Sequence, residues 1–154
     1  MNKYPSNQER TEEYLKLFNR EKTFKTIISD YDPIIFDVGA NNGRSLNEFK
    51  AWWPKSKVHC FEPQEECWVE LENNASRYNQ TFINKSAISV NDGVINFYVH
   101  DISTGLGGPN KINIDSTDSI DLKQLKSQSS EVISTYESTI NKPRSVPSLR
   151  LDNY

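Results

Sequence analysis

The alternation of apolar and polar segments along the chain predicts a β-α-β-α-β unit between residues 34 and 84. The short, nearly all-apolar run Ile34-Ile35-Phe36-Asp37-Val38 is typical of a strand buried on both faces. Similar runs predict strands over 58–61 and 81–84. Between the strands, apolar residues three or four apart predict helices over 45–53 and 65–78. Because parallel strands need such crossovers, the pattern predicts a doubly wound α/β sheet.

The segments on either side of this unit are less regular. Residues 1–33 are expected to form one helix, from about Asn7 to Arg20 behind a capping box of Ser6 and Glu9, and then a polar lead-in. Two apolar runs, 87–90 and 94–99, flank Asn91-Asp92-Gly93, and this arrangement predicts a β-hairpin. The polar, serine-rich stretch 109–145 favours an insertion or mobile segment with a strand near 132–136. A last edge strand is expected over 146–151.

Composition and charge narrow the class of protein. The chain has 154 residues, which fits one domain, and its formal net charge of −3 argues against a nucleic-acid partner. No apolar run approaches the roughly 20 residues of a membrane span, and the polar N-terminus does not resemble a secretory signal. Cys60 and Cys67 are expected to be reduced thiols, and with two histidines in the chain no metal site is expected. These features predict a cytoplasmic location.

The segment between the first strand and the first helix, residues 37–43, carries the clearest chemical signal. Glycine at positions 39 and 43 allows positive φ and a close approach of backbone to ligand, and the first amides of the following helix are free to bind an anion. Glu62 ends the second strand, where an acidic side chain can accept hydrogen bonds from a ribose diol. Together the two positions predict a pocket for an adenosine-bearing cofactor.

The spacing of the glycines helps to distinguish between the adenosine-bearing cofactors that such a pocket could bind. The dinucleotide fingerprint is Gly-x-Gly-x-x-Gly, and counting from Gly39 the chain has Asn41 and Arg44 at the second and third glycine positions. This departure argues against a nicotinamide cofactor. An NAD(P)-binding, oxidoreductase-like domain on the same sheet remains the alternative from another class of enzyme.

Several motifs together resemble the FkbM-type family of S-adenosylmethionine-dependent methyltransferases. The resemblance covers roughly residues 34 to 154 and rests on Phe36 to Gly43, Phe61-Glu62-Pro63, Ser86 to Ser89, Gly93 to Tyr98, Ser103-Thr104-Gly105 and Leu151-Asp152. It implies a Rossmann-like class I methyltransferase fold and S-adenosyl-L-methionine as the cofactor. It also implies O-methylation of a hydroxyl group on a sugar, glycolipid or other natural product.

The resemblance implies a set of site residues. Gly39 and Gly43 are expected beside the methionine end of the cofactor, Glu62 at the ribose, and Ser103-Thr104-Gly105 over the cofactor or facing the acceptor. His100 ends a strand and is a candidate general base, and no other base is assigned. The cofactor-binding residues predicted in this way are Asp37, Gly39, Ala40, Asn41, Asn42, Gly43, Glu62, Pro63, Ser86 and Ala87.

The family carries a further strand and a second acidic-glycine motif just after the position of Leu151-Asp152, whereas this sequence ends at Tyr154. We therefore expect residues 34–154 to form a methyltransferase domain truncated on its C-terminal side. A non-catalytic remnant of such an enzyme is a further alternative. Part of a doubly wound sheet is also expected to expose a strand edge and an apolar surface.

Overall fold

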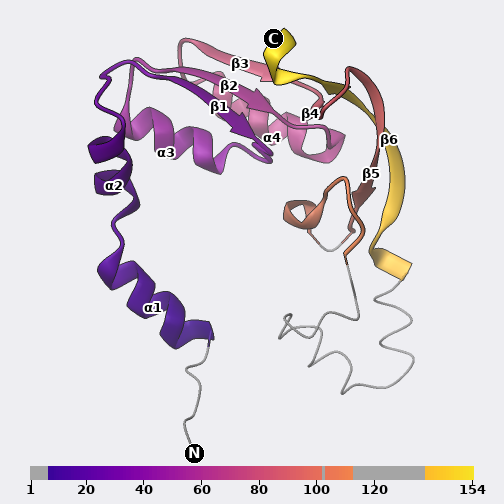
Figure 1. Ribbon diagram of the computed structural model, residues 1–154, viewed down its shortest axis with the longest axis horizontal. Coiled ribbons are helices and arrows are strands. Elements are labelled where there is room, and N and C mark those ends of the chain that lie inside the picture. Colours follow the sequence, from indigo (N-terminus) through magenta and orange to yellow (C-terminus); the bar gives the residue numbers. More distant parts are fainter. Residues whose placement is uncertain (1–6, 102, 113–137) are drawn as a thin grey trace, which may run out of the picture.

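The computed structural model describes residues 7–101, 103–112 and 138–154, and these form two three-stranded sheets (Figure 1), with strand orders β1-β2-β3 and β4-β6-β5. In chain order the elements are α1 (Asn7–Leu17), α2 (Arg20–Ile27), β1 (Ile34–Val38), α3 (Arg44–Trp52), β2 (Lys57–Phe61), α4 (Glu65–Ala75), β3 (Thr81–Asn84), β4 (Ala87–Ile88), β5 (Gly93–Val99), the 3-10 turn η1 (Thr104–Leu106), β6 (Lys142–Leu149) and the 3-10 turn η2 (Leu151–Asn153).

The first sheet confirms the predicted β-α-β-α-β unit. Its three strands are parallel, with Ile35 opposite Val58 and Val58 opposite Thr81. The crossover helices α3 and α4 lie together on one face of this sheet (Figure 1). Leu46 of α3 and Leu71 of α4 are fully buried there against the strands. The chain is thus an α/β protein with a mostly parallel sheet, which is consistent with a Rossmann-like fold.

The opposite face of this sheet is open, and here the prediction of a strand buried on both faces is wrong. Ile34, Phe36 and Val38 of β1 are 61%, 43% and 57% exposed. Both crossover helices pack on the other face, so no helix of the described residues covers these alternate side chains of β1. Phe82 of β3 is similarly exposed. The expected exposed apolar surface is therefore present.

An aromatic ladder runs across the open face. Phe36, His59 and Phe82 stand opposite one another on the three strands, and their ring centroids are 5.2 and 4.8 Å apart. Tyr154, just after η2, meets Phe36 and His59 edge-on, and its hydroxyl lies 2.7 Å from His59 Nδ1. The C-terminal residues are held by these contacts above the first sheet (Figure 1).

In the second sheet, the predicted hairpin between the segments that form β4 and β5 is wrong. Strands β4 and β5 do not pair with each other, because β6 lies between them, parallel to β4 and antiparallel to β5. The Asn91-Asp92-Gly93 turn is instead tied to the end of β6: Ser148 Oγ donates to Asn91 O, and Asp92 Oδ1 accepts the Arg150 amide. The strand expected at the edge is thus central, and it begins at Lys142, inside the predicted insertion.

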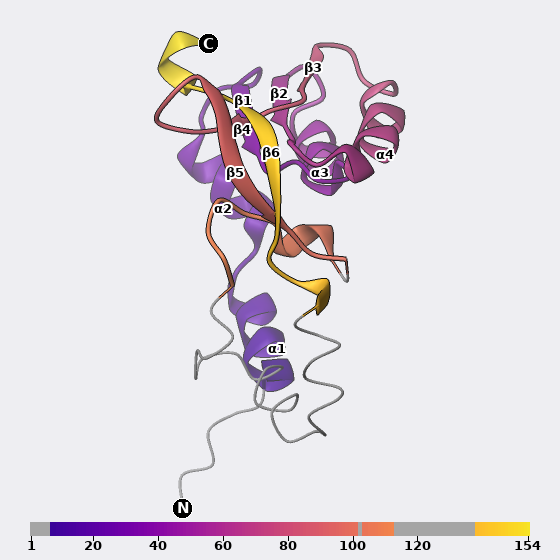
Figure 2. The same ribbon diagram turned by 90° about the vertical axis from the view of Figure 1, so that its right-hand side faces the viewer.

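The N-terminal region contains two helices where the sequence predicted one. Asn19 separates them and caps α2, because its side chain accepts a hydrogen bond from the Lys22 amide at 2.8 Å. Helix α2 is held on α3 by stacking of Phe24 on Trp52, whereas α1 extends away from both sheets (Figures 1 and 2). The predicted capping residue Ser6 and the strand near 132–136 lie outside the described residues. None of the described helices has the length and hydrophobicity needed to cross a membrane.

Candidate cofactor site

A cavity of about 250 Å³ lies where β1 and β2 end, facing the second sheet. Small-molecule sites are typically roughly 300–1,000 Å³, so this one is just below that range. Open parallel sheets bind ligands at the carboxyl ends of their strands, which is where the sequence placed the site. The cavity is lined by Val38, Gly39, Asn41, Phe61, Glu62, Pro63, Gln64, Ala87, Ile88, Ile95, Phe97, Thr104, Gly105, Gly107, Gly108 and Pro109.

Gly39 gives this cavity an open stretch of backbone. Its φ of +79° is a left-handed conformation, and its amide donates to Phe61 O at 2.9 Å, which fixes the turn against β2. Apart from its two chain neighbours, no described residue has an atom within 4 Å of the place where a Cβ would be. A ligand in the cavity can therefore approach the main chain closely at this residue.

Gly43 lies in the packing between α3 and α4. Its φ is also positive, at +87°, but a Cβ there would lie 3.1 Å from Leu71 Cδ1 and 3.2 Å from Asn74 Cβ, both on α4. The residue does not line the cavity. Its missing side chain lets the start of α3 pack against α4, and it shapes the site only through that packing.

Glu62 connects the two loops that form the polar side of the cavity. One carboxylate oxygen accepts the Asn41 amide and the other accepts the Gln64 amide, each at 2.8 Å. A third, longer hydrogen bond comes from Gln64 Nε2 at 3.4 Å. A carboxylate has about four acceptor positions, so the oxygen that accepts from Asn41 keeps one for a ligand. Among the described residues that line the cavity, Glu62 is the one titratable side chain.

Asn41 and Asn42 point in different directions. Asn41 has a φ of +47°, and its Nδ2 donates to Thr104 Oγ1 at 2.9 Å while its Oδ1 accepts the Asn42 amide. Asn42 instead faces α4, where its side chain reaches Glu70 and its carbonyl accepts from Asn74. Asn41 therefore belongs to the cavity, and Asn42 belongs to the packing of the loop on α4.

Asp37 is a buried carboxyl group behind the loop. It is 9% exposed, and its Oδ2 has no hydrogen-bond partner among the residues that the structure describes. Burial raises the pKa of Asp37 from 3.8 to about 6, Arg20 opposes the rise, and the nearby Glu62 adds to it. An unpartnered buried oxygen is costly, so this position is a candidate for a polar group or water that bridges to a ligand.

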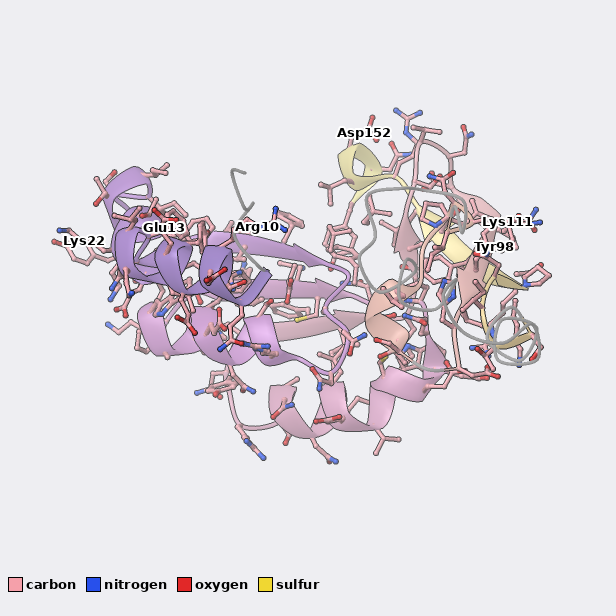
Figure 3. All side chains as sticks on the ribbon, turned by 90° about the horizontal axis from the view of Figure 1, so that it is seen from below. Arg10, Glu13, Lys22, Tyr98, Lys111 and Asp152 are labelled. Carbon is pink, nitrogen blue, oxygen red and sulfur yellow. The ribbon has the colours of Figure 1, made fainter. Side chains whose placement is uncertain are left out.

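A glycine-rich segment, residues 104–109, forms the far wall of the cavity. Thr104 is held from the first sheet by Asn41 and by Gln64, whose Nε2 donates to Thr104 O at 2.8 Å. Gly108 is held from the second sheet, where its amide and carbonyl exchange hydrogen bonds with Tyr98 at 3.0 and 2.7 Å. Beyond the wall, Lys111 lies over the Tyr98 ring (Figure 3). The wall thus joins the two sheets.

The predicted residues divide into two groups. The cavity brings together Gly39, Asn41, Glu62, Pro63 and Ala87, whereas Asp37, Ala40, Asn42, Gly43 and Ser86 lie behind it or in the adjoining packing. The sequence did not identify Gln64 or the apolar residues Ile88, Ile95 and Phe97. The one signal near Gln64 was the Phe-Glu-Pro motif immediately before it.

His100, the candidate general base, is not brought to the cavity. It follows β5, is 4% exposed, and its Nδ1 accepts a hydrogen bond from the Asn141 amide at 3.1 Å. Burial lowers the pKa of His100, and the nearby backbone of Leu106 partly offsets the change. A buried imidazole that already accepts a backbone hydrogen bond joins β5 to the start of β6, and this geometry gives it no access to a substrate in the cavity.

Part of the chain is similar to a known methyltransferase. No family model matches the chain. Over 73 residues it is 29% identical to the 2-O-methyltransferase NoeI of Sinorhizobium fredii (strain NBRC 101917 / NGR234). The match covers 47% of this chain and 30% of NoeI, so the chain spans less than a third of that relative. The similarity supports a relationship to methyltransferases.

Proposed function

We propose that this chain forms the cofactor-binding part of an S-adenosylmethionine-dependent methyltransferase. The observation that carries the proposal is the meeting of Gly39 and Glu62 in one cavity at the ends of two parallel strands. Open backbone and a fixed carboxylate are the two features that an adenosine-bearing ligand needs at this place in the fold. The partial similarity to NoeI favours a methyl donor over a nicotinamide.

The described residues fit such a cofactor. Glu62 would accept a ribose hydroxyl, and Gly39 would lie against the ligand without a side chain between them. The apolar residues Ile88 and Phe97 form the side of the cavity suited to a flat adenine ring. Behind the loop, the unpartnered Oδ2 of Asp37 offers an acceptor that a water could link to the amino group of the methionine portion.

When bound, S-adenosylmethionine supplies an electrophilic methyl group, so the protein mainly positions donor and acceptor. We propose a hydroxyl of a sugar, glycolipid or other natural product as the acceptor, in line with the O-methyltransferase name of the relative. Glu62 is the one titratable side chain of the described cavity lining, and its carboxylate already accepts the amides of Asn41 and Gln64. The described residues are therefore suited to binding the cofactor, and we assign no acid-base catalyst among them.

The role of Glu62 is best tested by changing the ligand rather than the protein. Replacing Glu62 by alanine would also leave the amides of Asn41 and Gln64 unpaired, so a loss of binding would have two causes. We would measure the affinity of the wild-type chain for S-adenosylhomocysteine and for its 2′-deoxy and 3′-deoxy analogues by calorimetry. Because a hydrogen bond to a charged group contributes about 1.5–3 kcal/mol, one deoxy analogue should bind at least about tenfold more weakly.

The same titrations with Glu62→Gln complete the test. The amide keeps the shape of the side chain, removes its charge and places an NH2 donor against the amide of Asn41 or of Gln64. That cost is common to the ligand and its deoxy analogue and cancels in their difference, which should shrink because the charge is gone. If both deoxy analogues bind the wild-type chain as tightly as S-adenosylhomocysteine, Glu62 does not hold the ribose. Binding of NAD in preference to S-adenosylhomocysteine would instead support the oxidoreductase-like alternative.

A further inference from the structure

Gln64 is the cavity residue whose role neither the motif nor the fold accounts for. It is 3% exposed and occupies the N-cap position of α4, yet its side chain makes no capping hydrogen bond. Ser, Thr, Asp and Asn are preferred at N-caps because their short side chains satisfy free helix amides. Gln64 uses its longer side chain in another way, away from its own helix.

The side chain of Gln64 makes its contacts across the cavity. Its Nε2 donates to the carbonyl of Thr104 at 2.8 Å and, at 3.4 Å, to the carboxylate of Glu62. Its backbone amide holds the same carboxylate oxygen at 2.8 Å. One residue therefore contacts both the acid on the first sheet and the wall that comes from the second sheet.

The wall is fitted closely to this side chain. A Cβ on Gly107 would lie 2.7 Å from Gln64 Oε1 and 2.9 Å from Gln64 Cδ, closer than real Cβ contacts allow. Glycine at this place lets the wall lie directly on the carboxamide plane. Removing the carboxamide would therefore leave the wall without both a hydrogen bond and a packing surface.

We propose that Gln64 is a positioning residue of the cofactor site: it fixes the Glu62 carboxylate and holds the 104–109 wall at the distance that closes the cavity around an adenosine-bearing ligand. This inference rests on the proposed function. Gln64 acts through Glu62 and the wall. Its effect should be seen in ligand affinity and in the local protection of the wall.

The experiment uses the full 154-residue chain and S-adenosylhomocysteine as the probe. Gln64→Met keeps the length of the side chain and removes its hydrogen bonds, and Gln64→Asn keeps an amide that is one methylene too short to reach Thr104. The matched control is Gln8→Met, which makes the same exchange at an exposed position on α1. Affinity is measured by calorimetry well below the melting temperature, and amide hydrogen exchange is followed for residues 104–108 without ligand.

Both Gln64 variants should bind S-adenosylhomocysteine about tenfold more weakly or worse, and their amides at 104–108 should exchange faster. The control variant should match the wild-type chain in both measurements. A merely structural Gln64 would lower the melting temperature without changing the affinity of the folded variants. If the wild-type chain binds S-adenosylhomocysteine and Gln64→Asn binds it with the same affinity, this inference is overturned and the proposed function stands. Absence of binding by the wild-type chain would overturn the proposed function, and the role of Gln64 with it.

Discussion

The buried Asp37 makes a prediction about stability that depends on pH. Its pKa is raised from 3.8 to about 6, chiefly by burial. The folded state therefore holds this proton to a higher pH than the unfolded state does. The stabilisation from the protonated form is complete below pH 3.8 and is lost as the pH rises through 6. A difference of about two pKa units corresponds to about 3 kcal/mol.

The substitution Asp37→Asn removes this titration and nearly preserves the shape of the side chain. The asparagine amide changes the free energy of unfolding by an amount of its own, but that amount does not depend on pH. The free energy of unfolding of Asp37→Asn minus that of the wild-type chain should therefore rise by about 2 to 3 kcal/mol between pH 4 and pH 7. The comparison uses a difference of differences, so errors common to both proteins cancel.

Urea unfolding at pH 4, 5, 6 and 7 measures this quantity, with Asp32→Asn as the control because Asp32 is exposed two residues before β1. The control variant should show a nearly constant difference from the wild-type chain. A flat difference for Asp37→Asn as well would refute the claim that an ionised Asp37 is costly in the folded state. A confirmed cost would mean that the chain keeps a destabilising carboxylate beside its candidate site, as functional residues often do.

Three substitutions test the packing around the site by chemical denaturation and binding. Gly43→Ala should lower the free energy of unfolding by at least about 2 kcal/mol, because its φ is +87° and its Cβ would press on Leu71; an unchanged midpoint would contradict this. Gly39→Ala has the same kind of strain but open space, so it should cost about 1 kcal/mol and weaken S-adenosylhomocysteine binding more than Gly43→Ala does. Lys50→Met should lower stability by about 1–3 kcal/mol, because the buried ammonium donates to three backbone carbonyls at the far end of the sheet, and ligand affinity should stay unchanged. A loss of affinity in Lys50→Met would show that the two ends of the sheet are coupled.

The sequence predicted the local part of this fold well. Strands β1 to β3 and helices α3 and α4 are short-range patterns, and Pro33, Gly39, Gly43, Pro54 and Pro63 mark several of their ends directly in the sequence. Helix α2 was missed because few of its residues are apolar. It depends on the Asn19 cap and on the contact of Phe24 with Trp52, which lies 28 residues further along the chain.

The error in the second sheet and the omission of Gln64 share a physical cause, which is contact between distant segments of the chain. A hairpin was expected from Asn91-Asp92-Gly93, but β6 enters from about 50 residues later and takes the place between β4 and β5. The site shows the same division. Gly39 and Glu62 were identified from their places at strand ends, whereas the contact of Gln64 with Thr104 spans 40 residues and leaves no local pattern.

Thermal unfolding followed by circular dichroism, with the chain alone and with excess S-adenosylhomocysteine or NAD, is the most direct experiment on the proposed cofactor. A ligand at about 100 times its dissociation constant adds about 2.7 kcal/mol to a folded state that binds it. We expect S-adenosylhomocysteine to raise the melting temperature and NAD to leave it unchanged. A cooperative transition that S-adenosylhomocysteine does not move would contradict the assignment of this cavity to a methyl-donor cofactor.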